Sequence, residues 1–224
     1  MFEELDDLFD SATIKPSFDY IHIILAIYLF GELKDQEGMG RYRLKEELLI
    51  GSGTVKSLIT KLNKKINFIS VVTNKNQKKG HKLTNKGQIF LKKIKNVVPI
   101  LKEGNSLILK EILIEKEDMN SYFCLIKNAA NKITDGIAQR DAAIKIDGSG
   151  ATCLIYNGNQ FIFPSIVSSD SDMDQIEINN NVQQYFKKEL VDANLKSNDV
   201  IIIGLGDSPQ KARLAALNAA LTLI

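Results

Sequence analysis

Cysteine and histidine are scarce in this 224-residue sequence, and their scarcity excludes several kinds of site. Cys124 and Cys153 lie in apolar segments with no other metal-ligating residues beside them, which predicts two buried, reduced thiols. His22 and His81 both precede residue 105, so residues 105–224 hold no Ser-His-Asp or Cys-His constellation for nucleophilic catalysis. We therefore expect no enzyme activity, no metal and no cofactor.

Long hydrophobic runs are also missing. The longest, residues 21–30, is far shorter than the roughly 18 apolar residues of a membrane-spanning helix. The first ten residues, MFEELDDLFD, are acidic where a signal peptide would be basic. The composition is that of a globular protein, with 44% hydrophobic and 25% charged residues. These features predict a cytoplasmic protein with no membrane partner.

Acidic residues are almost absent from one stretch of the chain. Between Arg41 and Lys95 there are fifteen Lys and Arg against only Glu46 and Glu47, a net charge of +13, whereas the rest of the chain carries −11. This segregation indicates a polyanionic partner for one region. A solvated basic surface is the alternative, but it leaves the scarcity of acids unexplained.

The basic stretch follows an acidic leader, residues 1–16, and a predicted helix. Apolar residues recur at helical spacing over residues 17–33, where Ser17 is a suitable N-cap. Residues 41–44 predict a short extended segment, and residues 45–49 a short helix that ends before a glycine-containing turn.

A further amphipathic helix is predicted to begin near Ser52. Its polar side presents hydroxyl and ammonium groups and no carboxylate. Its apolar stripe, spaced i, i+3, i+4 and i+7, predicts the buried side and consists of Val55, Leu58, Ile59 and Leu62.

A hairpin and another helix close the basic region. β-Branched residues predict a strand over 67–73, and a polar turn leads into a returning strand over 81–84. Helical spacing then predicts a helix from Thr84 or Asn85 to about Pro99.

This order of elements resembles the winged helix-turn-helix superfamily. Residues 44–65 are similar to its second and third helices, and residues 80–91 resemble the step from the wing to the next helix in many prokaryotic regulators. The resemblance covers residues 17–100 and implies double-stranded DNA as the partner, with the helix from Ser52 in the major groove. Winged helices that bind proteins instead usually lack such a cationic surface.

Twelve residues are the candidates for DNA contact. Those on the helix from Ser52 would read base edges or bind phosphates, although Ser52 suits a helix cap equally well. Those of the hairpin would follow phosphates or enter the minor groove, and the two arginines would bind phosphates or pair with Glu46 or Glu47. The candidates are Arg41, Arg43, Ser52, Thr54, Lys56, Ser57, Thr60, Lys61, Lys75, Lys78, Lys79 and Lys82.

The sequence predicts an α+β fold with two domains, a winged-helix domain over 17–104 and a second domain over 105–224. For the second we expect an α/β sandwich, and a ferredoxin-like order with an extra C-terminal helix is one arrangement of its elements. Those elements are a strand over 121–127, a helix over 131–146, strands over 151–156 and 160–163, a helix over 181–192, a strand over 200–204 and a helix over 209–223.

Three further features of the second domain carry expectations of their own. Residues 105–115 alternate apolar and polar residues, which predicts a linking strand or a dimer contact. The segment SSDSDMD, residues 168–174, predicts an acidic loop. Arg140 and Asp141 are expected to pair with each other rather than with a ligand.

The segment Gly204-Leu205-Gly206 follows an apolar strand and precedes a helix, which is the geometry of a phosphate cradle. The third glycine of a dinucleotide fingerprint and the lysine of a P-loop are both missing, and Asp207 would repel an anion. We therefore favour an ordinary helix start, with Ser208 as the N-cap and Pro209 in the first turn.

Two segments of the second domain carry a further resemblance, GIAQRDAAIKIDGSGAT (136–152) and GLGDSPQKARLAALNAA (204–220). They look like an uncharacterised domain attached to archaeal winged-helix transcriptional regulators, which implies an archaeal protein and supplies no ligand or catalytic residue. The sequence thus predicts a DNA-binding regulator whose second domain mediates homodimerisation, senses a small-molecule effector, or does both. The alternatives are a winged helix fused to a small-molecule kinase or other nucleotide-using enzyme, and a protein-interaction module of the transcription machinery.

Overall fold

The computed structural model describes six stretches of the chain, residues 2–9, 16–34, 37–74, 77–113, 119–164 and 178–224. It divides into two compact units, Met1–Ile94 (unit 1) and Lys95–Ile224 (unit 2). Each unit contains helices and a sheet of its own, so the predicted α+β class is confirmed.

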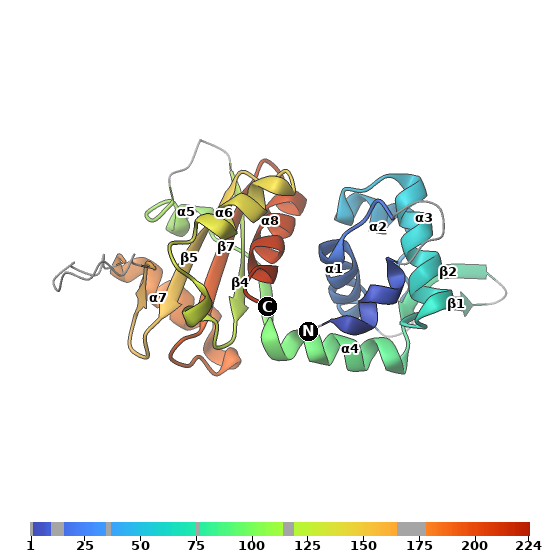
Figure 1. Ribbon diagram of the computed structural model, residues 1–224, viewed down its shortest axis with the longest axis horizontal. Helices are drawn as coiled ribbons and strands as arrows, with labels where there is room; N and C mark the ends of the chain where they lie inside the picture. Colours follow the sequence, from blue (N-terminus) through green and yellow to red (C-terminus); the bar gives the residue numbers. More distant parts are fainter. Residues whose placement is uncertain (1, 10–15, 35–36, 75–76, 114–118, 165–177) are drawn as a thin grey trace. The chain divides into compact units, whose positions relative to one another are not determined.

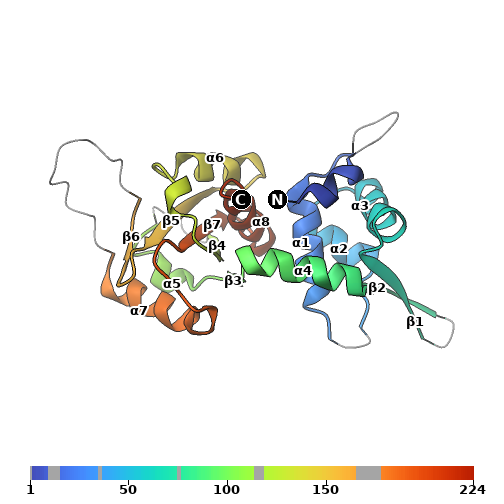
Figure 2. The same cartoon turned by 60° about the horizontal axis from the view of Figure 1, so that its bottom comes forward.

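Unit 1 combines helices with a two-stranded hairpin (Figures 1 and 2). Helix α1 is apolar on every side, and all its residues from Ile21 to Phe30 are buried, as expected of a helix that other elements surround. The elements of unit 1 are η1 (Glu3–Leu8), α1 (Tyr20–Gly31), α2 (Arg41–Leu48), α3 (Ser52–Thr60), η2 (Lys61–Lys65), β1 (Ile69–Asn74), β2 (Gln77–Leu83) and α4 (Asn85–Val97), of which residues 95–97 are counted with unit 2.

Helix α1 begins at Tyr20 with Asp19, not Ser17, as its N-cap. His22 Nδ1 accepts a hydrogen bond from the Asp19 backbone N–H at 2.9 Å, the returning half of a capping box. The predicted Ser17 cap is therefore wrong, because the chain enters the helix two residues later and leaves the Ser17 hydroxyl for another partner.

The start of α2 also differs from the prediction. Residues 41–44 are helical rather than extended, because Leu44 and Leu48, four residues apart, both bury their side chains and favour one continuous helix. Leu49, in the left-handed region with φ 53°, ends α2.

Helix α3 begins after a turn over residues 49–51 and has Gly51 as its N-cap, so Ser52 is the first helical residue and not the cap. The predicted core stripe is confirmed, since all four of its residues are buried. Helix α3 continues without a break into the π-helical turn η2.

The predicted hairpin and the helix after it are confirmed. Strands β1 and β2 pair antiparallel, from Ile69 opposite Leu83 to Asn74 opposite Gln77. A single bridge between Met39 and His81 adds the segment before α2 to this hairpin.

Unit 2 is a five-stranded antiparallel sheet with the strand order β3-β4-β7-β5-β6. Strand β7 lies in the middle, and all seven of its residues are buried. The elements of unit 2 are β3 (Ile100–Glu103), α5 (Ser106–Leu109), β4 (Asn120–Ile126), η3 (Ala130–Lys132), α6 (Ile137–Lys145), β5 (Gly150–Tyr156), β6 (Phe161–Ile162), α7 (Asn180–Glu189), η4 (Val191–Ala193), β7 (Val200–Gly206) and α8 (Pro209–Leu221).

Helices cover both faces of this sheet (Figure 1). Phe123 and Ile203 pack with Phe186 of α7 on one face, whereas α6 and α8 pack on the other, where the Cys124 thiol contacts the Ala216 carbonyl oxygen. A ferredoxin-like arrangement with its helices on one face is therefore not the one observed. The physical reason is that the central strands are apolar on both sides, so each face needs a covering layer.

Two shorter segments correct the predictions further. Residues 106–109 form helix α5, not a strand, because the Asn105 side chain accepts hydrogen bonds from the N–H groups of Leu107 and Ile108 and caps the helix. The strand in this part of the chain is β3, which pairs with β4. Helix α6 is shorter than predicted, because Gly136, with φ 82°, separates it from η3. The predicted acidic loop over 168–174 lies outside the described residues.

Among the described residues, no helix combines the length and the apolarity that crossing a membrane requires.

Candidate nucleic-acid interface

The side of α3 and η2 opposite the buried stripe is polar, exposed and free of carboxylates. We call this set of four side chains, Lys56, Ser57, Thr60 and Lys64, the outward face. At 100° per residue these positions cluster on the side of the helix opposite Val55 and Leu62. The Thr60 hydroxyl donates to the Lys56 carbonyl oxygen at 2.8 Å, which leaves its lone pairs accessible. The face can therefore offer ammonium and hydroxyl groups to an anionic surface.

Helix α2 lies next to α3 and presents the two arginine candidates in its first turn. The Arg41 guanidinium lies 5.1 Å from the centre of the Tyr42 ring, which is 72% exposed. Arg43 Nε lies 4.0 Å from Glu47 Oε1, so the local ion pair that the sequence offered as an alternative is formed, with Arg43 exposed and Glu47 half-buried.

Residues 2–9 of the acidic leader contact one side of η2, a feature that the sequence analysis did not predict. Lys61 Nζ donates to the Leu8 carbonyl oxygen, and Thr54 Oγ1 shares a hydrogen bond of 2.7 Å with Ser17 Oγ. Both side chains are half-buried, so Lys61 lies against the leader and Thr54 lies against Ser17, the residue after the leader, rather than on the outward face. The signal that could have shown this is the apolar spacing of Leu5 and Leu8 within the acidic run.

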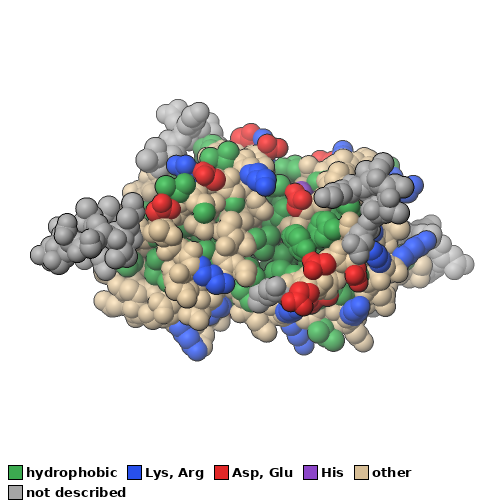
Figure 3. All heavy atoms as spheres, in the orientation of Figure 1, with side chains coloured by type: hydrophobic (Ala, Val, Ile, Leu, Met, Phe, Trp, Pro, Cys, Tyr) green, Lys and Arg blue, Asp and Glu red, His purple; other side chains and the backbone are tan. Residues whose placement is uncertain are grey.

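The hairpin adds two lysines to the basic surface of unit 1. Lys79 and Lys82, both on β2, are exposed. Lys78 belongs to β2 as well, whereas Lys75 lies outside the described residues. Figure 3 shows Lys and Arg side chains over α3 and the hairpin, and Asp and Glu side chains gathered over η1.

The candidates thus fall into three groups. Six of them share α3 and the first residue of η2, two lie on α2, and the described hairpin candidates lie on β2. Lys64 on the outward face and Tyr42 beside the arginines belong to the same surface, but the sequence analysis did not include them among the candidates.

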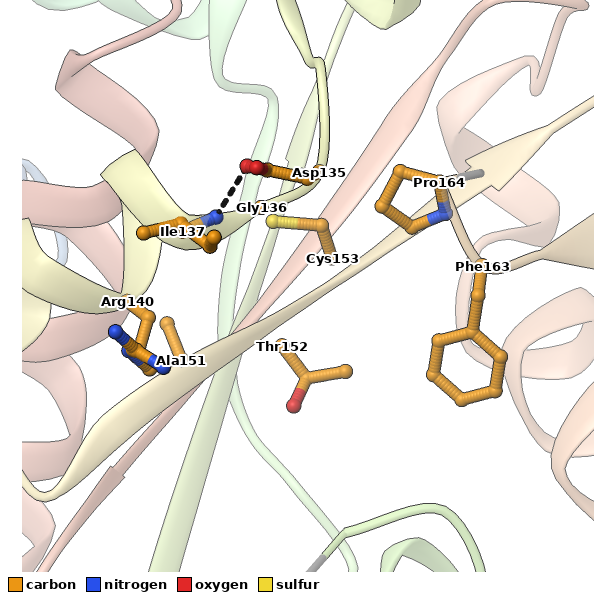
Figure 4. A pocket seen from close by; sticks show the side chains of 9 residues that line it. All are labelled: Asp135, Gly136, Ile137, Arg140, Ala151, Thr152, Cys153, Phe163 and Pro164. Atoms are coloured by element: carbon orange, nitrogen blue, oxygen red, sulfur yellow. Dashed lines mark hydrogen bonds between the residues drawn. The ribbon is translucent and has the colours of Figure 1, made fainter. Parts of the chain in front are cut away.

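Unit 2 contains a pocket of about 220 Å³ between the start of α6 and the end of β6 (Figure 4). Arg140, Thr152 and Cys153 line it together with the apolar side chains of Phe163 and Pro164. Arg140 pairs with Asp141 at 3.0 Å, which confirms the predicted local pairing.

The pocket does not hold an activated nucleophile. Burial, with a smaller contribution from the charge of Asp135, raises the pKa of Cys153 to about 12, so its thiol stays protonated near neutral pH. Cys124 is also buried and free, which confirms the prediction of two buried thiols. Within the ranges that the structure describes, no group of three or more His, Cys, Asp or Glu residues could hold a metal ion.

The glycines after β7 serve packing. A Cβ built on Gly204 would overlap the backbone of Ala216, and one on Gly206 would overlap the backbone of Ala212, so both positions let α8 approach the sheet closely. Ser208 caps α8 and accepts from Lys211 N at 3.3 Å, with Pro209 in the first turn. The predicted ordinary helix start is confirmed.

Comparisons with known proteins show that unit 2 resembles one protein family and that the chain shares its fold with a solved structure. Residues 118–223 match a domain of unknown function (DUF4443). No curated protein matches the sequence. The solved structures that match include a hypothetical protein from Pyrococcus horikoshii OT3, with 23% sequence identity, a TM-score of 0.61, and coverage of 92% of this chain and 93% of that chain. Unit 2 is thus similar to a domain of unknown function, and the chain shares its fold with the hypothetical Pyrococcus protein.

Proposed function

We propose that unit 1 is a winged helix-turn-helix module that binds double-stranded DNA, and that the chain is a transcriptional regulator. The observation that carries this proposal is the outward face, an exposed and carboxylate-free surface on a helix that follows another helix after a turn over residues 49–51. Short turns of this kind, often with a glycine, join the two helices of DNA-binding helix-turn-helix motifs.

The chemistry of the outward face suits a duplex groove. A helix fits the major groove, where its N-terminal half lies nearest to the base edges. Lys56 and Ser57 lie in the N-terminal half of the continuous helix that α3 and η2 form, and Thr60 and Lys64 follow Lys56 one and two turns later. Hydroxyl groups can hydrogen-bond to several different bases, whereas lysines neutralise phosphates and release condensed counterions. Binding to duplex DNA would therefore depend mainly on phosphate contacts and only weakly on the base sequence.

The hairpin would extend the contact along the backbone of the DNA. Lys79 and Lys82 are exposed on β2, and the bridge between Met39 and His81 ties this strand to the segment before α2. Lysines on such a wing contact phosphates and fix the orientation of the protein on the duplex.

For unit 2 we propose pairing of two copies of the chain and recognition of a small effector. A homodimer would place two copies of α3 about one helical turn of DNA apart, which matches a pseudo-palindromic site. The pocket supports the effector, since Arg140 and Thr152 supply polar contacts beside an apolar wall.

The test is the affinity of the full chain for a labelled duplex, measured by fluorescence anisotropy at 100 mM salt. The double substitution K56A/K64A should weaken binding about tenfold, because two phosphate contacts and their counterion release are lost. The matched control is K187A/K188A on α7, which removes the same charge from exposed positions of unit 2 and should leave affinity nearly unchanged. Equal losses in both variants, or no duplex binding by the unsubstituted chain at 50 mM salt, would contradict the proposal.

A further inference from the structure

Residues 2–9 of the acidic leader are part of the fold of unit 1. Phe2, Leu5 and Leu8 are 9%, 0% and 0% exposed, so the apolar side of η1 is anchored in the core. The opposite side carries four exposed carboxylates, those of Glu3, Glu4, Asp6 and Asp7. The leader therefore holds a fixed line of negative charge against unit 1.

Three lysines of the basic stretch are bound to this leader. Lys61 Nζ donates to the carbonyl oxygen of Leu8, and Lys65 Nζ donates to that of Asp7. Lys93 Nζ on α4 donates to both carboxylate oxygens of Glu4, at 2.8 and 2.9 Å. These ammonium groups are cations that a phosphate backbone would otherwise attract.

Lys61 and Lys65, which bind the leader, and Thr54, which hydrogen-bonds to Ser17, occupy one flank of the proposed DNA-binding helix. Thr54, Lys61 and Lys65 lie between the buried stripe and the outward face of α3 and η2, as a periodicity of 100° per residue requires. A helix in the major groove has a phosphate strand along each of its flanks. On this flank, phosphates would meet carboxylates of the leader instead of free ammonium groups.

We infer that the acidic leader is an intramolecular competitor that lowers the affinity of unit 1 for duplex DNA. The inference rests on the proposed function and adds to it a control of the affinity of the same DNA-binding surface. Its action is electrostatic, because the leader presents carboxylates to the approaching phosphates and occupies Lys61, Lys65 and Lys93. It should therefore be strongest at low salt and fade as the salt concentration rises.

The test neutralises the carboxylates and keeps the apolar anchor. The full chain with E3Q/E4Q/D6N/D7N retains Phe2, Leu5 and Leu8, and an unchanged melting temperature of unit 1 would verify that η1 stays in place. At 50 mM salt this variant should bind a labelled duplex at least about fivefold more tightly than the unsubstituted chain, and at 300 mM salt the gain should shrink to less than about twofold.

The control makes the same change of net charge at exposed acids of unit 2, E103Q/E111Q/D141N/D192N. A gain confined to the leader variant supports the inference. If all three proteins bind duplex DNA and the two variants gain affinity equally, or neither gains any, the inference is overturned. The proposed function then still stands. The absence of duplex binding in all three proteins at 50 mM salt overturns the proposed function itself.

Discussion

Asp199 is a buried acid with a complete set of partners. Its side chain is 1% exposed and accepts from Lys127 Nζ at 2.5 Å, from Asn128 N at 3.0 Å and from Lys196 N at 2.8 Å. Removing one partner of a buried pair leaves the other desolvated and unpaired, and this loss dominates the energetics.

The substitution D199A should lower the free energy of unfolding of unit 2 by about 3–5 kcal/mol, because it leaves two backbone N–H groups without an acceptor and the Lys127 ammonium with only the carbonyl oxygens of Ala193 and Asn194. Chemical denaturation followed by circular dichroism measures the change. The comparison is D141A, which breaks the exposed pair with Arg140 and should cost less than about 1 kcal/mol. Similar losses in the two variants would show that the Asp199 network contributes little.

His22 gives unit 1 a pH-dependent stability. Burial lowers the pKa of His22 against the opposing effect of Asp19, and its Nδ1 accepts a hydrogen bond only while the ring nitrogen is unprotonated. In the unfolded chain the imidazole takes up a proton near pH 6.5, so the unfolded state binds more protons and stability falls as the pH drops below that value.

The substitution H22Q should reduce this pH dependence. Glutamine at the third position of a helix returns the same hydrogen bond to the N-cap residue but does not titrate. Between pH 7.5 and 5.5 the unsubstituted chain should lose up to about 1.4 kcal/mol per pH unit more than H22Q. Parallel loss of stability in the two proteins over this range, measured by denaturant titration, would contradict the assignment.

At the scale of elements, a glycine in helix α3 and a glycine in strand β7 have opposite effects on stability. Gly53 lies in the first turn of α3, and a Cβ there meets nothing within 4 Å. Gly204 lies in β7, where a Cβ would overlap the backbone of Ala216 in α8. The backbone of α8 cannot move aside without disturbing the whole helix-on-sheet contact.

We therefore expect G53A to raise the free energy of unfolding by up to about 1 kcal/mol and G204A to lower it by about 3 kcal/mol. Thermal unfolding followed by circular dichroism distinguishes the two effects, since each belongs to a different unit. If G204A left the free energy of unfolding unchanged, α8 would not pack against β7 as closely as it does in the structure.

The elements that the sequence predicted well are those with a regular apolar period. The spacing of Val55, Leu58, Ile59 and Leu62 gave the buried side of α3, and the β-branched run after Asn67 gave strand β1. Short elements whose ends depend on a cap were predicted less well. Asn105 turns an alternating segment into helix α5 by accepting two backbone hydrogen bonds, and local periodicity does not contain that information.

At the scale of the whole molecule, the sheet order and the position of the leader could not be predicted. The order β3-β4-β7-β5-β6 places the last strand of the chain in the middle of the sheet, a result of long-range packing on both faces. The leader was predicted only as an acidic segment, although its apolar residues Leu5 and Leu8 anchor it in unit 1. Charge and helical periodicity therefore predicted the candidate site, but they did not predict that the leader binds lysines on one side of it.

The account depends most on the claim that the outward face of α3 neutralises phosphates of duplex DNA. The salt dependence of affinity tests this claim directly, because the slope of log K against log salt counts the phosphates that are neutralised, about 0.9 for each. The unsubstituted chain should show a steep slope over 50–300 mM salt, and K56A/K64A should reduce it by about 1.8, whereas K187A/K188A should not change it. A slope that K56A/K64A leaves unchanged would contradict the account.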